Sequence, residues 1–574
     1  MSHEEIFRQL LKARGLQDTE AQRAFLDPQY EAYRHDAFLL PDMAQAVDRL
    51  VRAREQQEKI TIYGDYDIDG LTATTVLLDA FESFGFRHVE AFIPNRFVEG
   101  YGLTVDAVER IANPPGGGGA QLIVTVDCGS LSEKEIRRAA ELGVDVIVTD
   151  HHNVAPVQPP AVAAVVNPKR LLHDHPEMYM NYIASEPKIQ NPKSKIYPFV
   201  DLAGVGVAFK LVQALQTRLP GLEKGKEKWL LDLVALGTVC DVVTLRDENR
   251  ANVRWGLEVM KKTRRPGLRA LMAVSGVKQA EVSARSLGFG LGPRLNAAGR
   301  LETAQLALDL LRSTDPVQAL ELAEQLDAMN AERRAEQDRI FQEATVQAQQ
   351  FVNDPVLVVS DPTWSHGIIG IVAAKLLERY HKPTFVLQEM GEQSKGSARS
   401  FGDFSAADAI RATEHLIIKG GGHKLAAGVT LETAHIVAWR RAINEHYRTL
   451  ALNGQAEALL ARADVTLEVF DGINEALVGM IAQLEPFGNG NAQPVFCFRR
   501  LVVIQRRLMG ANAQHVKYSF QDGSRQTLQA LAFNAADRFT HEPGEVVNVW
   551  CELDINEWQG RRSVEGRLLR LEDV

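Results

Sequence analysis

Acidic and imidazole side chains follow short apolar segments at several separate places in this chain. Asp65, Asp67 and Asp69 lie in ITIYGDYDIDG, Asp127 in LIVTVDCG, Asp150, His151 and His152 in DVIVTDHH, and Asp241 in GTVCDVV. Short apolar runs that alternate with helical patterns are typical of strands buried in a parallel sheet. The pattern therefore predicts an α/β fold. Since the carboxyl ends of parallel strands gather at one edge of a sheet, where ligands bind, we expect these side chains to converge.

Carboxylates that converge in this way oppose one another's ionisation, and a divalent cation removes the conflict. Asp and His ligands suit Mn²⁺ or Mg²⁺ better than a thiolate zinc site, and several shared carboxylates favour two ions. The alternative is that each Asp only caps a helix or forms a turn, as Asp69-Gly70 would by itself. The joint occurrence of the clusters at corresponding strand ends favours the metal site.

Length and composition limit the class of protein. A chain of 574 residues predicts about three or four domains. The four cysteines form no CxxC pair, which argues against a disulfide framework and a cysteine zinc site. The first residues lack the apolar core of a secretion signal, and no run of about 18 apolar residues occurs, so we expect a cytoplasmic protein without membrane contact. The net charge of −10 does not exclude nucleic acid, because binding needs only a local basic groove.

The sequence pattern changes along the chain. We expect a helical cap at 1–47, a parallel-sheet domain at 48–309, a connecting helix at 310–352, a second, smaller α/β domain at 353–452, and a linker with a small OB-like β-barrel at 453–574. The connecting helix has helical periodicity that only Pro316 interrupts. A polar segment at 173–198 resembles an insertion. The barrel is expected from short alternating strands at Val495–Arg499, Val516–Phe520, Thr527–Phe533 and Val546–Leu553.

Ordered motifs along nearly the whole chain resemble one known family. They are GDYDIDG at 64–70, IPNRFVEGYG at 93–102, VDCG at 126–129, DHH at 150–152, LAGVGVAFK at 202–210, CDVVTLRDENR at 240–250, GPRLNAAGR at 292–300, WSHGIIGIVAAKL at 364–376, GSARS at 396–400 and GGGHKLAAG at 420–428. In these motifs the chain resembles the RecJ family of the DHH phosphoesterase superfamily. The resemblance implies a DHH domain, a DHHA1-type domain and an exonuclease that degrades single-stranded DNA from the 5′ end to 5′-mononucleotides.

The resemblance also implies roles for individual residues. Metal ligands would be Asp67, Asp69, Asp127, His151 and Asp241, with Asp127 bridging two Mn²⁺ or Mg²⁺ ions; Asp65 and Asp150 would be auxiliary, and His152 would contact the scissile phosphate. Phosphodiester hydrolysis would then use water activated by the ions, and no protein nucleophile would be required.

Substrate-binding residues are expected in two places. Ser397, Arg399, Gly421, Gly422 and His423 belong to motifs that in this family bind the 5′ phosphate. Simple tight-turn geometry is the alternative for GGGH. Arg96, Tyr101, Arg294 and Arg300 are expected to line the approach to the metal site, where Tyr101 could stack on a base. The barrel carries aromatic residues among basic ones, and Trp558 is its best candidate for exposure; the aromatic set is Phe496, Phe498, Tyr518, Phe520, Phe533, Trp550 and Trp558.

Two departures from the family pattern and two alternative functions remain. Ile68 replaces a frequent Ala, and the insertion at 173–198 is longer than expected.

A DHH phosphodiesterase for cyclic dinucleotides or short oligonucleotides would need neither a long helix nor a barrel. A non-catalytic DNA-binding relative would have lost ligands that are all present here. In cells, the resemblance implies DNA repair and recombination, with a single-strand-binding protein and a RecQ-type helicase as partners.

Overall fold

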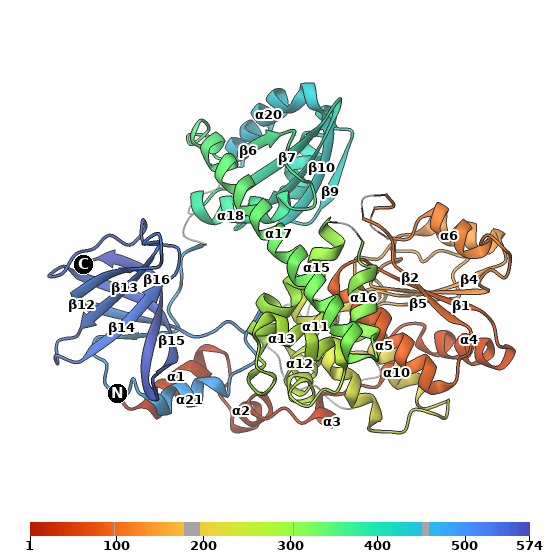
Figure 1. Ribbon diagram of the computed structural model, residues 1–574, viewed down its shortest axis with the longest axis horizontal. Helices are drawn as coiled ribbons and strands as arrows, with labels where there is room; N and C mark the ends of the chain where they lie inside the picture. Colours follow the sequence, from red (N-terminus) through yellow and green to blue (C-terminus); the bar gives the residue numbers. More distant parts are fainter. Residues whose placement is uncertain (97, 101, 177–195, 302, 451–458) are drawn as a thin grey trace. The chain divides into compact units, whose positions relative to one another are not determined.

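The computed structural model describes every residue except 97, 101, 177–195, 302 and 451–458. The described residues form two compact units, Met1–Asp327 together with Ala463–Val574, and Ala328–Arg462 (Figure 1). Tyr101 and most of the expected insertion lie outside the described residues. In the part of the chain that is described, no helix is both long and apolar enough to cross a membrane.

A parallel sheet forms the centre of the first unit, as predicted. Its strands are β1 (Ile60–Gly64), β2 (Val89–Phe92), β3 (Leu122–Val126), β4 (Asp145–Thr149) and β5 (Ala164–Val166), in the order β2-β1-β3-β4-β5. Every residue of β1 and β3 is buried. A strand buried on both faces is mostly apolar, which explains the near-continuous apolar runs in the sequence.

Helices cover both faces of this sheet. On one face α6 (Val105–Ala112) and α7 (Glu133–Glu141) share an apolar core with the strands. On the other face lie α4 (Met43–Gln56), α5 (Ile68–Phe84) and α10 (Gly204–Leu215). The other α-helices before the long helix, among the described residues of this unit, are α1 (His3–Ala13), α2 (Thr19–Leu26), α3 (Tyr30–Tyr33), α8 (Leu171–Asp174), α11 (Leu231–Cys240), α12 (Asp247–Met260), α13 (Pro266–Ser275), α14 (Ala284–Ser286), α15 (Gly292–Leu301) and α16 (Gln305–Arg312).

The long helix α17 (Pro316–Gln349) continues from the first unit into the second. The helical pattern is interrupted at Pro316, as predicted. Helix α16 ends at Arg312, and Pro316 is the first residue of α17. Proline suits this position because the amide hydrogen that it lacks would have no partner within the helix.

The second unit contains a smaller mixed sheet, as predicted. Its strands are β6 (Leu357–Asp361), β7 (Thr384–Met390), β8 (Gln393–Arg399), β9 (Lys419–Gly422) and β10 (Ala426–Glu432), in the order β6-β7-β8-β10-β9. Helices α19 (Ala406–Ala412) and α20 (Ile436–Thr449) share an apolar core with one face of this sheet. Helix α18 (Ile369–Tyr380) contacts β7 and β8. The glycine-rich segment, expected as a turn, forms the edge strand β9 and the turn into β10.

A six-stranded barrel follows, also as predicted. Its strands are β11 (Val465–Leu467), β12 (Val495–Met509), β13 (His515–Gln521), β14 (Thr527–Ala532), β15 (Val546–Trp558) and β16 (Arg561–Asp573), and α21 (Glu475–Ala482) lies between β11 and β12. Pairing of β12 with β15 closes the sheet. The barrel aromatics Phe496, Phe498, Tyr518 and Phe520 are buried, whereas Phe533 is 61% exposed. The side chain of Trp558 lies outside what the structure describes.

The N-terminal helix α1 packs into this barrel. A capping box of Ser2 and Glu5 begins the helix, and Ile6, Phe7, Leu10 and Leu11 join the core that the barrel strands form. The two ends of the described chain therefore share one apolar core, although their sequences lie far apart.

Candidate functional site

The predicted ligand residues converge at the carboxyl edge of the parallel sheet. Asp65 directly follows β1, Asp127 follows β3, and Asp150, His151 and His152 follow β4. Asp67 is the N-cap of α5, where its carboxylate accepts the Gly70 N–H, and Asp69 lies in the first turn of that helix. Asp241 arrives from a different kind of element, because it is the C-cap of α11.

Distances show how tightly these side chains are grouped. One ligand atom from each residue lies within 4.8 Å of the others in three overlapping groups: Asp65 with Asp67 and Asp127, Asp127 with His151 and His152, and Asp69 with His151 and Asp241. The Nε2 atom of His151 is 3.1 Å from Asp127 Oδ1 and 3.5 Å from Asp241 Oδ2. Asp127 and His151 are each common to two of these groups.

Burial and mutual repulsion shape the electrostatics of this cluster. Burial, with the charge of Asp67, raises the pKa of Asp69 to about 7. Burial, with the charges of Asp69 and Asp67, raises the pKa of Asp241 to about 9. The pKa of Asp127 is well above the usual carboxyl value for the same reasons. In contrast, burial lowers the pKa of His151 to about 3, so its imidazole is neutral at pH 7 and keeps a lone pair.

Several potential metal-ligand atoms of the cluster make no hydrogen bond to the part of the protein that the structure describes. Among the described residues, Asp65 Oδ1, Asp127 Oδ1, His151 Nε2 and Asp241 Oδ2 are buried without a hydrogen bond. Buried polar atoms normally have partners, so four such atoms at one place require an explanation. Oxygen and imidazole donors fit a pair of divalent cations such as Mn²⁺ or Mg²⁺. The donor set and its geometry therefore fit a metal centre.

The amino end of α10 holds one of these carboxylates in place. The Gly204 and Val205 N–H groups donate to Asp69 at 2.6 and 2.8 Å. A side chain at Gly204 would come within 2.6 Å of Asp127 Oδ1, so only glycine allows this approach. The motif LAGVGVAFK thus supports the cluster through its backbone, which side-chain patterns in the sequence do not reveal.

Asp150 orients the ring of His152. Its carboxylate accepts the N–H groups of Ser130, His151 and His152, and one of its oxygens also lies 2.9 Å from His152 Nδ1. Burial alone would lower the pKa of His152, but the hydrogen bond and charge of Asp150 raise it. The side chain of His152 is 37% exposed, compared with 8% for His151. The ring of His152 is therefore more accessible than that of His151.

Asn167, which was not among the residues predicted from the sequence, also fixes this loop. Its completely buried amide donates to Ser130 Oγ at 2.8 Å and to the His152 carbonyl at 2.9 Å. Asn167 directly follows β5, so its position after an apolar strand could have identified it.

The residues expected along the approach have different surroundings. The Arg96 guanidinium lies over the Tyr66 ring, 5.2 Å from its centre, and the charge of Arg300 also acts on Tyr66. Both arginines thus lie near the ligand segment. Arg294 instead donates to Asp327 at 2.8 Å and to the Gly290 carbonyl at 2.7 Å, and its side chain is only 12% exposed. Those contacts give Arg294 a role in joining α15 to α17.

The expected phosphate residues form a second group, in the other unit. Ser397 pairs with Gly428, which pairs with Gly421, so these three residues form one row across β8, β10 and β9. Arg399 lies two residues further along the same face of β8, and its Nη1 lies 3.3 Å from Ser397 Oγ. Gly422 pairs with Ala427 on the opposite face, and the exposed His423 begins the hairpin turn.

The amino end of α18 lies over this row. A side chain at Gly370, in the first turn of α18, would come within 2.9 Å of Ser397 Oγ and 3.2 Å of Arg399 Nη2. A hydroxyl, a guanidinium and helix N–H groups thus meet, and together they suit a phosphate group.

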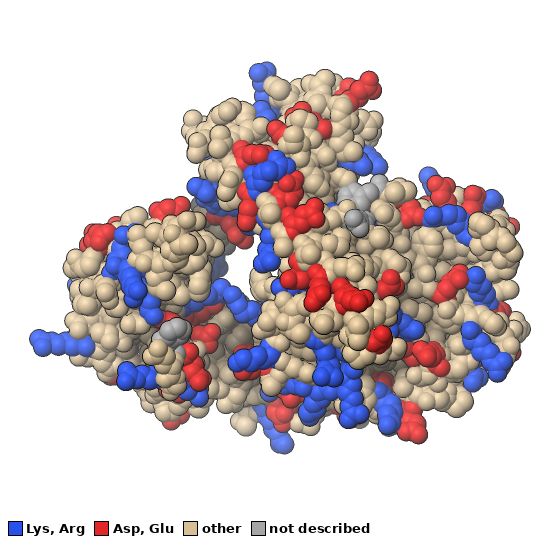
Figure 2. Space-filling model, in the orientation of Figure 1, with Lys and Arg blue, Asp and Glu red and all other residues tan. Residues whose placement is uncertain are grey.

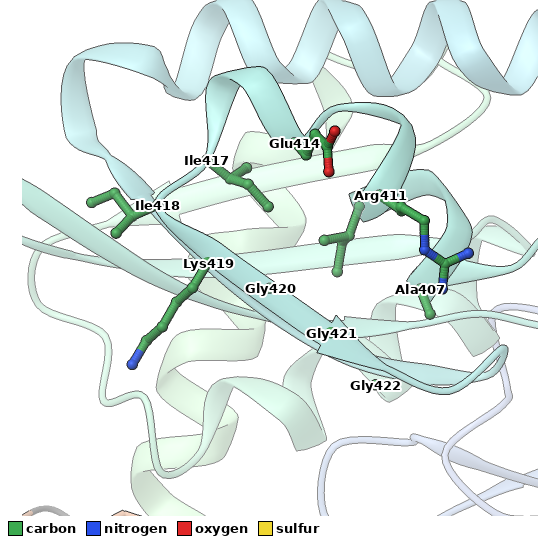
Figure 3. A pocket seen from close by; sticks show the side chains of 10 residues that line it. Ala407, Arg411, Glu414, Ile417, Ile418, Lys419, Gly420, Gly421 and Gly422 are labelled. Atoms are coloured by element: carbon green, nitrogen blue, oxygen red, sulfur yellow. The ribbon is translucent and has the colours of Figure 1, made fainter. Parts of the chain in front are cut away.

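The glycine strand also borders a pocket on its α19 side. Ala407, Ile410 and Arg411 of α19 line this pocket together with Glu414 and residues 417–422 (Figure 3). All four residues of β9 are exposed, so the backbone of the strand is accessible.

Comparisons with known proteins agree with this arrangement. Residues 59–238 match the DHH family, N-terminal domain, residues 353–448 match the DHHA1 domain, and residues 463–570 match the RecJ OB domain. The single-stranded-DNA-specific exonuclease RecJ of Bacillus subtilis is 37% identical over 96% of this chain and 66% of its own length. The protein of the same name from Dickeya dadantii is 35% identical over 92% of this chain and 90% of its own length.

Solved structures give the same result. RecJ from Thermus thermophilus in complex with Mn²⁺ superposes with a TM-score of 0.76 and 29% identity, over 99% of this chain and 75% of that chain. A structure of RecJ from the same organism in complex with Mg²⁺ gives a TM-score of 0.73.

Proposed function

The chain belongs to the RecJ family, and we propose that it is a metal-dependent exonuclease specific for single-stranded DNA that degrades strands from the 5′ end. The observation that carries this proposal is the group of buried potential ligand atoms that make no hydrogen bond, which belong to residues that include Asp127, His151 and Asp241. The relatives named RecJ and the two metal-bound structures support the same activity and the same kind of cofactor.

In the proposed mechanism the side chains hold the cofactor and orient the scissile phosphodiester. Asp67, Asp69, Asp127, His151 and Asp241 would hold two divalent cations. When bound, such cations activate water and balance charge on the reacting oxygens. Asp150 accepts a hydrogen bond from Nδ1 of His152 and raises its pKa, and the protonated ring would donate from Nε2 to a phosphate oxygen. Asp65 stays close to Asp67 and Asp127, where it can accept a proton or complete the ligand set.

A direct assay tests this function. Purified protein with Mn²⁺ is incubated with 3′-labelled single strands that carry a 5′ phosphate, with duplexes, and with a cyclic dinucleotide, and the products are identified by mass. We expect 5′-mononucleotides from single strands only. Cleavage of the cyclic dinucleotide in preference to strands would favour the alternative phosphodiesterase activity.

Replacing His152 with alanine is expected to reduce the rate far more than it reduces metal binding. The ring is more exposed than that of His151 and is held by Asp150, so it is placed for substrate. Loss of a group that moves or donates a proton costs about 10²–10⁴ in rate. Turnover and bound Mn²⁺ are measured together, with His151→Ala as the comparison that should lose metal. Equal losses of rate and metal in His152→Ala would make His152 a ligand.

The substrate-binding proposal concerns the second unit, where Ser397, Arg399 and the amino end of α18 would bind the 5′ phosphate. Gly421 and Gly428 keep the neighbouring sheet face free of side chains, so a strand of DNA could lie close to the backbone. Gly422 and His423 would shape the hairpin that borders this face.

Replacing Arg399 with alanine is expected to slow degradation of 5′-phosphorylated strands by about 10- to 100-fold. A hydrogen bond to a charged group contributes about 1.5–3 kcal/mol, and about 1.4 kcal/mol is a factor of ten. Rates on strands with a 5′ hydroxyl should change little. Arg448→Ala, an exposed arginine of α20, is the matched control. Equal slowing on both kinds of strand would place the phosphate pocket elsewhere.

The barrel would hold the strand during degradation. Lys and Arg side chains lie on its surface (Figure 2). The exposed basic residues of its strands include Arg499, Arg500, Arg507, Arg561 and Arg562. The exposed Phe533 ring, which packs edge-on against His515, can stack on a base. Stacking and phosphate neutralisation bind single strands without reading their sequence.

A single-strand-binding protein and a RecQ-type helicase are proposed partners. Family resemblance alone supports these two partners, and the proposed cellular setting is DNA repair and recombination in the cytoplasm. Sedimentation of the purified protein with each candidate, in the absence of DNA, tests for direct complexes.

A further inference from the structure

The backbone turns sharply directly after Asp241. Val242 has a φ of 60°, a left-handed conformation that β-branched residues rarely adopt. Its side chain is 65% exposed, so packing of that side chain does not hold the turn. A strained conformation of this kind persists only where neighbouring groups fix it.

A loop from the C-terminal part of the unit supplies these groups. Asn489 lies between α21 and β12, and its side-chain amide donates to the Val242 carbonyl at 2.9 Å. The backbone carbonyl of Asn489 accepts the Leu245 N–H at 2.7 Å. These two hydrogen bonds hold residues 242–245 at both ends.

The loop around Asn489 has its own internal support. Gly488 and Asn491 exchange backbone hydrogen bonds of 3.0 and 3.1 Å. The Asn491 side chain donates to the carbonyls of Leu484 and Pro486, both at 2.8 Å. These hydrogen bonds fix the backbone of the loop that carries Asn489.

The two loops are also in close contact. A side chain at Gly490 would come within 2.2 Å of Thr244 Oγ1, and one at Gly488 would come within 2.7 Å of Leu245 Cδ1. No room is left for residues 244 and 245 to shift towards this loop.

We propose that Asn489 is a positioning residue that holds the ligand Asp241 in place for metal binding. On one side of Asp241 the helix α11 fixes the backbone, since the Asp241 N–H donates to the Gly237 carbonyl at 2.9 Å. On the other side Val242 would relax towards negative φ without its partner, and this rotation would move the carboxylate away from His151 Nε2, now 3.5 Å distant. The inference rests on the proposed metal-dependent function.

The first experiment measures Mn²⁺ binding by calorimetry and by electron paramagnetic resonance. In Asn489→Ala we expect the affinity for one Mn²⁺ to fall by about 10- to 100-fold, as for other groups that orient metal ligands. At limiting Mn²⁺ the kcat should fall while the KM for a short oligonucleotide stays unchanged. Asn474→Ala is the matched control, because this exposed asparagine caps α21 and donates nothing to residues 242–245.

The second experiment separates positioning from general stability. Glycine adopts positive φ without strain, so Val242→Gly should need the support of Asn489 less. We therefore expect Asn489→Ala to weaken Mn²⁺ binding less in the Val242→Gly background than in the natural one. Equal weakening in both backgrounds, or no weakening in either, would overturn the proposal.

Failure of this inference can be distinguished from failure of the proposed function. If the unmodified protein binds no Mn²⁺ at the cluster, the proposed function fails. If the unmodified protein binds Mn²⁺ and Asn489→Ala binds it equally well, only the role of Asn489 fails. Asn489 is exposed, so its replacement should leave the fold intact, and circular dichroism checks this.

Discussion

Replacing Asp127 with asparagine is expected to lower the turnover of single-stranded DNA by about a thousandfold or more. Asp127 has a φ of 62°, which asparagine tolerates, so the backbone should not change. The amide cannot supply the negative charge that two cations share. Loss of their charge stabilisation costs several kcal/mol, and each 1.36 kcal/mol is a factor of ten. Turnover is measured with saturating Mn²⁺ and quantified by product mass.

The metal-free variant should also be more stable to heat than the unmodified protein near pH 8. Burial and the neighbouring carboxylates raise the pKa of Asp127 in the folded protein, so the empty site loses stability as the pH rises above the usual carboxyl pKa. Asparagine does not ionise and avoids this loss. Asp106→Asn, an exposed carboxylate in the first turn of α6, is the control for both measurements. Near-normal turnover of Asp127→Asn with saturating Mn²⁺ would rule out the two-ion assignment.

Chelation of divalent cations is expected to abolish activity and to make thermal stability fall with rising pH. The folded pKa values of Asp69, about 7, and Asp241, about 9, lie above the usual carboxyl value. Unfolding therefore releases protons, so this stabilising contribution is complete below about pH 4 and is lost as pH rises through 7 to 9. For a domain of 150–250 residues, about 1 kcal/mol shifts the Tm by about 2–4 °C. Calorimetry between pH 5 and 9 with excess chelator measures this fall.

Added Mn²⁺ should reverse the effect, because a cation stabilises the ionised cluster. A ligand at a hundred times its Kd stabilises the folded state by about 2.7 kcal/mol. The difference in Tm between the Mn²⁺-loaded and chelated protein should widen as pH rises. Asp241→Asn removes one of the titrating carboxylates and should flatten the chelated profile. A chelated profile that rises with pH would contradict the raised pKa values.

Much of the first unit could be predicted from sequence because its central strands are mostly apolar. Ile60–Gly64 and Leu122–Val126 are buried on both faces, so their apolar pattern correctly indicated buried strands. The residues that follow these parallel strands lie at the same edge of the sheet. The convergence of Asp65, Asp127 and His151 followed from this rule. The barrel was predicted for a similar reason, since its strands alternate apolar and polar residues.

What could not be predicted depends on backbone groups and on distant pairs. The Gly204 and Val205 N–H groups that hold Asp69 leave no mark in a pattern of side chains. The strand Arg561–Asp573 was missed because its charged residues obscure the alternation. The contact of Asn489 with Val242 joins segments that the sequence keeps far apart, and no local preference indicates such a pair.

Because α1 packs against the barrel, the first helix of the chain can complete its folding only after the last strands are synthesised. During synthesis the apolar face of α1, with Ile6, Phe7, Leu10 and Leu11, leaves the ribosome long before the strands that bury it. Burial of each such side chain stabilises the folded state by about 1.5–3 kcal/mol. Until the last strands are synthesised, this apolar face stays exposed and can associate with other chains. A chain stopped before β12 would keep that face exposed and would be prone to aggregate. Loss of activity after truncation of the barrel would therefore report incomplete folding as well as lost DNA binding.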